Sequence, residues 1–281
     1  MALKVLAIVA LGLPGAVQAR QLQPMPVVPI VAPPPPPMPV VTIVVPPPPM
    51  LVGEPAPVFE RLASLVAPDG NAEAAVDRLS AALLQSMTAK DANFADAVAR
   101  YPGLDDAVST AMRPLLLEGT RTATPMYRAD LARFYAARLS VKEAGQFADF
   151  LVKPGPRKFF DTARAQNSYK AISSNLADEK AATAEAVRRD FSNAGQKAAD
   201  VLTEAEKAEL MLFFGSPLGL KLRSFGADKT ALDLKWFNYA PPELETRIGR
   251  TVLQAMIDHV AKTDRKTADS MRRILKDDLA D

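Results

Sequence analysis

The chain has 281 residues, a formal net charge of +2 and 48% hydrophobic residues, which is an ordinary composition for a globular protein. It contains no cysteine and a single histidine, His259, which excludes disulfides, thiolate metal sites, cysteine nucleophiles and any site that needs two histidines of one chain. With so little net charge and only 6% aromatic residues, we expect no nucleic-acid partner.

The first 19 residues, MALKVLAIVALGLPGAVQA, have the layout of a secretory signal peptide. Lys4 is followed by an apolar run over residues 5–13, and Val17 and Ala19 stand at the minus-three and minus-one positions of a cleavage site. We expect cleavage between Ala19 and Arg20; the alternative is an uncleaved N-terminal anchor. The apolar run is too short to span a bilayer, and no later segment is long and apolar enough. The prediction is a mature chain without a transmembrane segment, in the periplasm or outside the cell.

Residues 20–57 form a proline-rich segment, since fifteen of the 25 prolines fall between positions 24 and 57. Proline fixes φ and lacks an amide hydrogen, so such runs favour polyproline II geometry over helix or sheet. We expect a disordered tether. A ligand for a proline-recognising partner is the alternative.

Residues 58–281 are rich in helix-forming residues and show no strand-like alternation, which predicts an α-helical domain. Pro114 is expected to kink or divide a helix, and the stretch 168–202 is a long helix candidate that 192–195 could interrupt. Predicted helices cover residues 72–87, 105–119, 126–139, 168–202 and 243–262.

Two segments of this domain, residues 139–159 and 202–222, align without a gap at an offset of 63. Each begins with a capping-box pattern, in which a hydroxyl residue stands three positions before a glutamate. Each then breaks at a proline, which suits the first position of a following helix. The alignment predicts two related helix–corner–helix units. The aligned residues are Ser140, Glu143, Phe150, Pro154 and Lys158 in the first copy, and Thr203, Glu206, Phe213, Phe214, Ser216, Pro217, Gly219 and Lys221 in the second.

The second copy resembles the motif of the DUF2059 family of exported bacterial proteins. It departs from that motif at Lys207 and Phe214, where leucine and tyrosine are usual. The first copy is degraded, with Leu151, Lys153 and Pro156 where an aromatic residue, serine and glycine are expected. The resemblance implies an all-α domain in the cell envelope. It implies no catalytic mechanism, so it assigns no active-site residues.

Four other features favour structural roles over functional sites. Residues 215–219 lack the strand that a nucleophile elbow needs. His259 lies at the flank of an apolar helical stripe, and Asp105 and Asp106 fall in a first helical turn, where they favour the helix dipole. The aromatic residues at 236–239 favour core packing over a ligand groove.

Basic residues flank both corners, and either a solvated face or a shallow anion or polymer contact accounts for them. These residues are Lys153, Arg157, Lys158, Lys221 and Arg223.

The sequence therefore predicts an exported all-α protein without catalytic, cofactor or metal residues. Its expected function is non-enzymatic, through contact with an envelope protein or a cell-wall component. The alternative is a periplasmic module that binds a small molecule or lipid in an apolar groove.

Overall fold

The structure is a computed structural model that describes residues 55–178, 180–241 and 243–277, and it confirms the all-α prediction. This part of the chain contains no strand. The predicted signal peptide, the cleavage site between Ala19 and Arg20, and the proline-rich segment up to residue 54 lie outside the described residues. Pro57, which the sequence places in the tether, is instead the first residue of a helix, a position where its missing amide hydrogen is tolerated.

The described residues contain thirteen α-helices and one short 3₁₀ helix, at Asp69–Asn71. The α-helices are α1 (Pro57–Val66), α2 (Ala72–Lys90), α3 (Ala92–Arg100), α4 (Leu104–Ala136), α5 (Val141–Leu151), α6 (Pro154–Gln166), α7 (Lys170–Ala177), α8 (Ala184–Asp200), α9 (Glu204–Gly215), α10 (Pro217–Ser224), α11 (Gly226–Phe237), α12 (Leu244–Val260) and α13 (Arg265–Asp277).

The long helix α4 corrects the sequence-based boundaries. The segments 105–119 and 126–139 were expected as separate helices, yet α4 continues through both Pro114 and Pro125. A proline inside a helix costs about 3 kcal/mol. Burial of the apolar residues around the first proline, including Leu116 at 0% exposure and Met112 at 1%, offsets that cost. Tertiary packing therefore overrides the local helix-breaking signal.

The stretch 168–202 is also divided differently from the expectation. It forms α7, which ends at Ala177, and α8, which begins at Ala184, and no interruption falls at 192–195. Thr183 explains the position, because its hydroxyl accepts a hydrogen bond from the backbone amide of Ala186 and caps α8. Gly195 lies inside α8 and is buried there.

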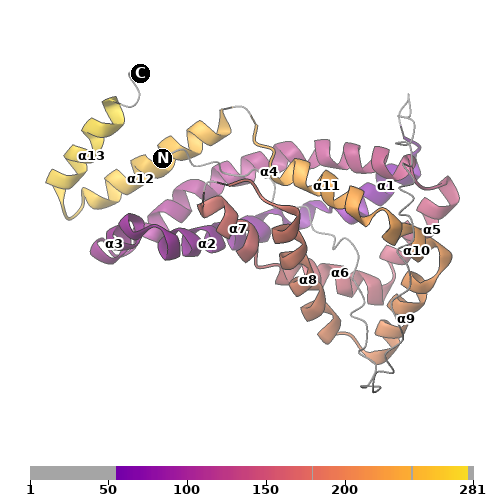
Figure 1. Cartoon of the computed structure of the whole chain (residues 1–281). Coiled ribbons are helices and arrows are strands. Elements are labelled where there is room, and N and C mark those ends of the chain that lie inside the picture. The colour runs from indigo at the N-terminus through magenta and orange to yellow at the C-terminus, as the bar shows by residue number, and fades with distance from the viewer. Residues whose placement is uncertain (1–54, 179, 242, 278–281) are drawn as a thin grey trace, which may run out of the picture.

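Helix α4 is the spine of the molecule, and it contacts α1, α2, α11 and α12 along its length. Figure 1 shows α5, α9 and α10 at one end of this spine and α13 at the other. Two further pairs, α2 with α7 and α6 with α8, extend the packing below it. None of the helices in the described ranges combines the length and apolar character needed to cross a bilayer.

A buried polar group ties α11 to α4. Tyr127 donates a hydrogen bond to Asp233 at 2.6 Å, and the Lys229 ammonium donates to the Tyr127 hydroxyl at 3.0 Å. Burial raises the pKa of Asp233, and Lys229 and Tyr127 partly offset that rise. Trp236 and Phe237, in the last turn of α11, are buried in the core. The Trp236 ring nitrogen donates a hydrogen bond to Asp130 at 3.0 Å. The preference for core packing at residues 236–237 is thus confirmed.

Candidate functional site

The first corner joins α5 to α6, and its capping box forms as the sequence predicts. Ser140 accepts a hydrogen bond from the Glu143 amide at 3.2 Å, while the Glu143 carboxylate accepts one from the Ser140 amide at 2.7 Å. Pro154 is the first residue of α6. Phe147 and Phe150 face the core from the last turns of α5.

The second corner joins α9 to α10 by the same devices. The Thr203 hydroxyl and the Glu206 carboxylate exchange hydrogen bonds with each other's backbone amides, at 3.3 Å and 2.8 Å. Ser216 accepts from the Gly219 amide at 3.2 Å and donates to the Phe213 carbonyl at 2.6 Å. Its hydroxyl therefore caps α10 and closes the corner, as the structural interpretation of residues 215–219 requires.

Gly219 allows a close approach that no other residue type would tolerate at this corner. A Cβ atom at position 219 would lie 2.3 Å from the Phe213 carbonyl oxygen, and that oxygen belongs to the backbone and cannot rotate away. Pro217 stands at the first position of α10. Together they fold α10 sharply back against the end of α9.

The two corners meet each other through equivalent residues. The rings of Phe150 and Phe213, which are 63 positions apart, stack with centroids 3.6 Å apart and an interplanar angle of 6°. Phe214 meets Phe150 edge-on, with a 5.9 Å centroid separation. Contact between equivalent residues of two repeats indicates a local pseudo-two-fold relation. We call the region around these rings the corner junction.

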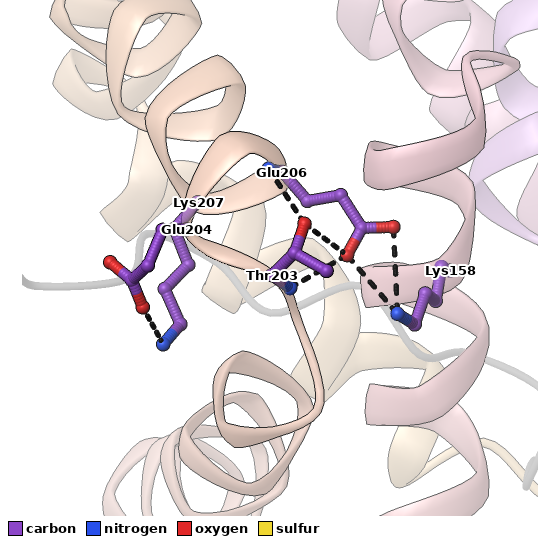
Figure 2. A network of polar contacts seen from close by, with 5 residues as sticks. All are labelled: Lys158, Thr203, Glu204, Glu206 and Lys207. Carbon is purple, nitrogen blue, oxygen red and sulfur yellow. Dashed lines mark hydrogen bonds and ion pairs between the residues drawn. The ribbon is translucent and has the colours of Figure 1, made fainter.

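Charged residues cross the corner junction reciprocally. Lys158 of the first copy pairs with the Glu206 carboxylate of the second at 3.1 Å, as Figure 2 shows. Lys221 of the second copy pairs with the Glu143 carboxylate of the first at 2.8 Å. Each lysine therefore binds the glutamate that closes the other copy's capping box. The alignment at an offset of 63 matches Lys158 with Lys221 and Glu143 with Glu206. It does not reveal that each lysine pairs with the glutamate of the other copy.

These contacts perturb the two carboxylates in the same direction. The Lys221 ammonium, followed by the Ser140 amide, lowers the pKa of Glu143 to about 2. The Thr203 amide, followed by the Lys158 ammonium, lowers the pKa of Glu206. Both glutamates are thus held ionised by hydrogen bonds to their charged form, which is the environment of a structural lock rather than of a proton-transfer group.

The other basic residues near the corners also have partners at the surface. Lys153 pairs with Glu209 at 3.1 Å and Arg157 with Asp161 at 3.6 Å. Arg223 donates to the Phe214 carbonyl at 2.8 Å. These side chains are exposed and pair with neighbours at the surface, which fits the solvated face and does not test an anion contact.

An open groove of about 800 Å³ lies beside the corner junction, between α9 and the first corner. Leu212 lines it and is 77% exposed, while its neighbour Met211 is 68% exposed. Ala205 and Ala208 lie on the same side of α9 and are also exposed. We call the residues Ala205, Ala208, Met211 and Leu212 the α9 face. The remaining lining residues are Phe150, Lys153, Pro154, Gly155, Glu206, Glu209 and Phe213.

The other sequence candidates lie apart from this groove or have structural partners. His259 of α12 is partly buried, and its Nε2 atom lies 3.0 Å from the carbonyl oxygen of Pro102. Asp105 and Asp106 fall in the first turn of α4, as predicted. Among the described residues, no group of three or more His, Asp or Glu side chains is arranged to hold a metal ion.

Comparison of the chain with protein-family models, with curated proteins and with solved structures gives no match. The resemblance to the DUF2059 family accordingly stays a prediction, carried by the quoted motif residues.

The α9 face is the feature that sequence reasoning missed. Helical spacing places Ala205, Ala208 and Leu212 on one side of α9, which was available as a signal. Nothing in the local pattern, however, distinguishes an apolar stripe that another helix covers from one that stays exposed.

Proposed function

We propose that this is an exported, non-enzymatic protein of the bacterial cell envelope that acts by binding another protein through the α9 face. The N-terminal pattern and the resemblance to an exported family support the location, in the periplasm or alternatively outside the cell. Cell-wall contact is the related hypothesis. Protein contact is favoured because the exposed surface beside the groove is apolar rather than rich in unpaired polar groups.

The single observation that carries this proposal is the exposure of Met211 and Leu212 beside the open groove. Large apolar side chains that lie singly on a surface need no explanation, but a contiguous set next to a concavity is typical of an interaction site. Burying one leucine removes roughly 1.5–3 kcal/mol of unfavourable hydration. An apolar partner surface would gain that free energy here.

Charge is already neutralised around the groove, which also favours an apolar contact. Lys153 and Glu209 pair with each other, and Glu206 pairs with Lys158. Glu204, at the start of the α9 face, pairs with Lys207 at 2.8 Å, as Figure 2 shows. A strongly charged partner would have to displace these pairs, whereas an apolar partner would leave them intact.

Co-sedimentation with the isolated envelope fraction tests this proposal. The full chain, processed by its host, is compared with Leu212→Asp and with the matched control Leu220→Asp, which changes another exposed leucine on the neighbouring helix α10. We expect Leu212→Asp to reduce the pelleted fraction at least several-fold and Leu220→Asp to leave it unchanged. Equal pelleting of all three proteins would contradict the assignment to the α9 face. Intact mass of the exported form tests cleavage after Ala19 separately.

A small apolar molecule or lipid is the second candidate ligand, favoured by one observation. The open groove is lined in part by the apolar side chains of Phe150, Leu212 and Phe213. Native mass spectrometry of the protein purified from its host would then show a bound species of constant mass. A spectrum of the bare chain, with envelope binding retained, would leave protein contact as the function.

A further inference from the structure

We propose that one face of α13 docks on the anionic surface of a phospholipid membrane. The residues of this face, which we call the α13 face, line a shallow open hollow; they are Arg265, Lys266, Asp269, Arg272 and Arg273. Figure 1 places α13 at the opposite end of α4 from α9. The proposal therefore concerns a second surface, and it rests on the proposed function only for the export that would bring the chain to a membrane.

The inner side of α13 is held against the rest of the protein. Ala268 is fully buried and Met271 is partly buried, and both pack in a small apolar cluster with Tyr101. Asp264, just before the helix, accepts hydrogen bonds from the Thr267 amide and from the Tyr101 hydroxyl, each at 3.0 Å. Helical spacing places the residues of the α13 face on the other side of the helix, so they point outward from a fixed support.

Three cations of the α13 face have no carboxylate partner in the part of the chain that the structure describes. Arg272 takes both neighbouring carboxylates, Asp269 at 2.8 Å and Asp258 of α12 at 3.8 Å. The exposed cations that form no ion pair with a described residue are Arg265, Lys266 and Arg273. The α13 face thus differs from the corner junction, where each lysine is paired with a glutamate, and it leaves positive charge available to an external anion.

Two of these cations oppose the dipole of the helix that carries them. Arg265 and Lys266 lie in the first turn of α13, which contains no acidic residue. A helix dipole favours negative charge at this end, so the stability of α13 does not explain the two side chains. Together with the positive helix end they produce one region of positive potential, which attracts phosphate groups.

The surroundings of the α13 face favour lipid headgroups over an acidic protein as the partner. A protein interface has an apolar core inside a polar rim. Among the described side chains, every large apolar one that is exposed lies at or before residue 220, so none borders the α13 face. The phosphates of an anionic bilayer repeat across a plane and need only exposed cations for attraction.

Flotation with lipid vesicles tests the proposal on the full chain, processed by its host. The vesicles contain phosphatidylcholine alone or an equal mixture of phosphatidylcholine and phosphatidylglycerol. At low ionic strength we expect binding to the anionic vesicles only, and weaker binding as salt is added. Arg265→Gln combined with Lys266→Gln should weaken it about 25-fold, or about fivefold for each cation, which corresponds to about 1 kcal/mol per cation.

A matched variant controls for net charge. Lys142→Gln combined with Lys197→Gln removes the same charge from exposed positions on α5 and α8, and it should bind like the unchanged chain. Circular dichroism checks that both double variants keep their helix content. Inorganic phosphate, compared with chloride at equal ionic strength, distinguishes a membrane surface from a site for one phosphate ion. Displacement by phosphate but not by chloride would overturn the membrane assignment.

The outcomes separate this proposal from the proposed function. No flotation with anionic vesicles, or equal losses in the two double variants, overturns docking through the α13 face. The vesicles contain no protein, so Leu212→Asp should float like the unchanged chain whether or not the α9 face binds a protein. Co-sedimentation with the envelope fraction at physiological salt, where screening weakens the α13 contact, reports the α9 face separately.

Discussion

The two corners have the same local design and opposite surroundings. Helix α5 buries Ala144, Phe147, Ala148, Phe150 and Leu151, whereas α9, which is closer to the family motif, buries only Leu210. Both corners have a capping box, a proline at the start of the second helix, and a lysine that pairs with the capping-box glutamate of the other corner. What differs is the neighbouring helix: α1 packs on α5, whereas α9 packs mainly against α6 and α10.

This difference teaches that the motif specifies a corner and not its burial. The hydroxyl–glutamate pair and the proline act within a few residues of one another, so they fold the same way in either setting. Whether a corner helix is buried depends on which distant segment of the chain packs against it. The second copy is thus a finished local structure with one apolar side uncovered, which is why we place the binding surface there.

Removing one aromatic ring from each corner should give the largest loss of unfolding free energy. The two losses should differ, which makes this the clearest test of the contrast between the corners. Phe150→Ala deletes a ring that is 3% exposed and should lower the free energy of unfolding by about 3–5 kcal/mol. Phe213→Ala deletes the partly buried equivalent, and we expect about 1–2 kcal/mol. Urea denaturation measures both. Equal losses would contradict the contrast in burial.

Replacing one glycine in each corner by alanine should give the next largest effect on stability. Gly219→Ala forces a Cβ atom against a backbone oxygen, so we expect a loss of about 1–3 kcal/mol in thermal unfolding. At Gly155 the nearest atom, 3.1 Å from an added Cβ, is the end of the Glu209 side chain, which can move. Gly155→Ala should therefore cost little. A well-tolerated Gly219→Ala would show that the second corner is looser than described.

The capping boxes should respond alike, which sharpens the claim that the local design is shared. Ser140→Ala and Thr203→Ala each remove one N-cap acceptor and should each destabilise the protein by about 1 kcal/mol. Serine and threonine exchanged at these positions should be nearly neutral. A cap that matters in one copy only would indicate that the corners are not equivalent.

Lowering the pH should weaken the reciprocal ion pairs and so lower the free energy of unfolding. This is the smallest of the expected effects. The pKa of Glu143 falls from about 4.3 in the unfolded chain to about 2 in the folded protein, so its stabilisation is complete above the higher value. It is lost as the pH falls through the interval toward 2. Glu206 acts in the same direction. Glu143→Gln should flatten the decline in unfolding free energy over that interval; an unchanged slope would argue against the Lys221 contact.

Much of the fold was predictable because its signals are local. The capping boxes at Ser140 and Thr203, the prolines that open α6 and α10, and the stripe of Leu244, Ile248 and Val252 in α12 all act over a few residues. These elements were identified from the sequence. The same reasoning failed at Pro114, where burial of neighbouring leucines outweighs the local cost.

The candidate site was harder to predict because it depends on long-range contacts. The alignment matched Lys158 with Lys221, but only the fold shows that each pairs with the glutamate of the other copy. The exposure of Leu212 is equally invisible locally, because the spacing of apolar residues does not show which of them another helix covers. Whether a helix is covered or exposed depends on segments that are distant in the chain, and no short sequence pattern shows which segment will pack against it.

The central claim is that the two corners form one pseudo-symmetric junction, and a double-mutant cycle on Phe150 and Phe213 tests it most directly. Stacked rings contribute about 0.5–1.5 kcal/mol beyond their burial, so the losses from Phe150→Ala and Phe213→Ala should not add in the double variant. A coupling free energy in that range is the predicted result. Additivity within about 0.3 kcal/mol, the usual error of independent sites, would mean that the two rings do not interact and would contradict the account.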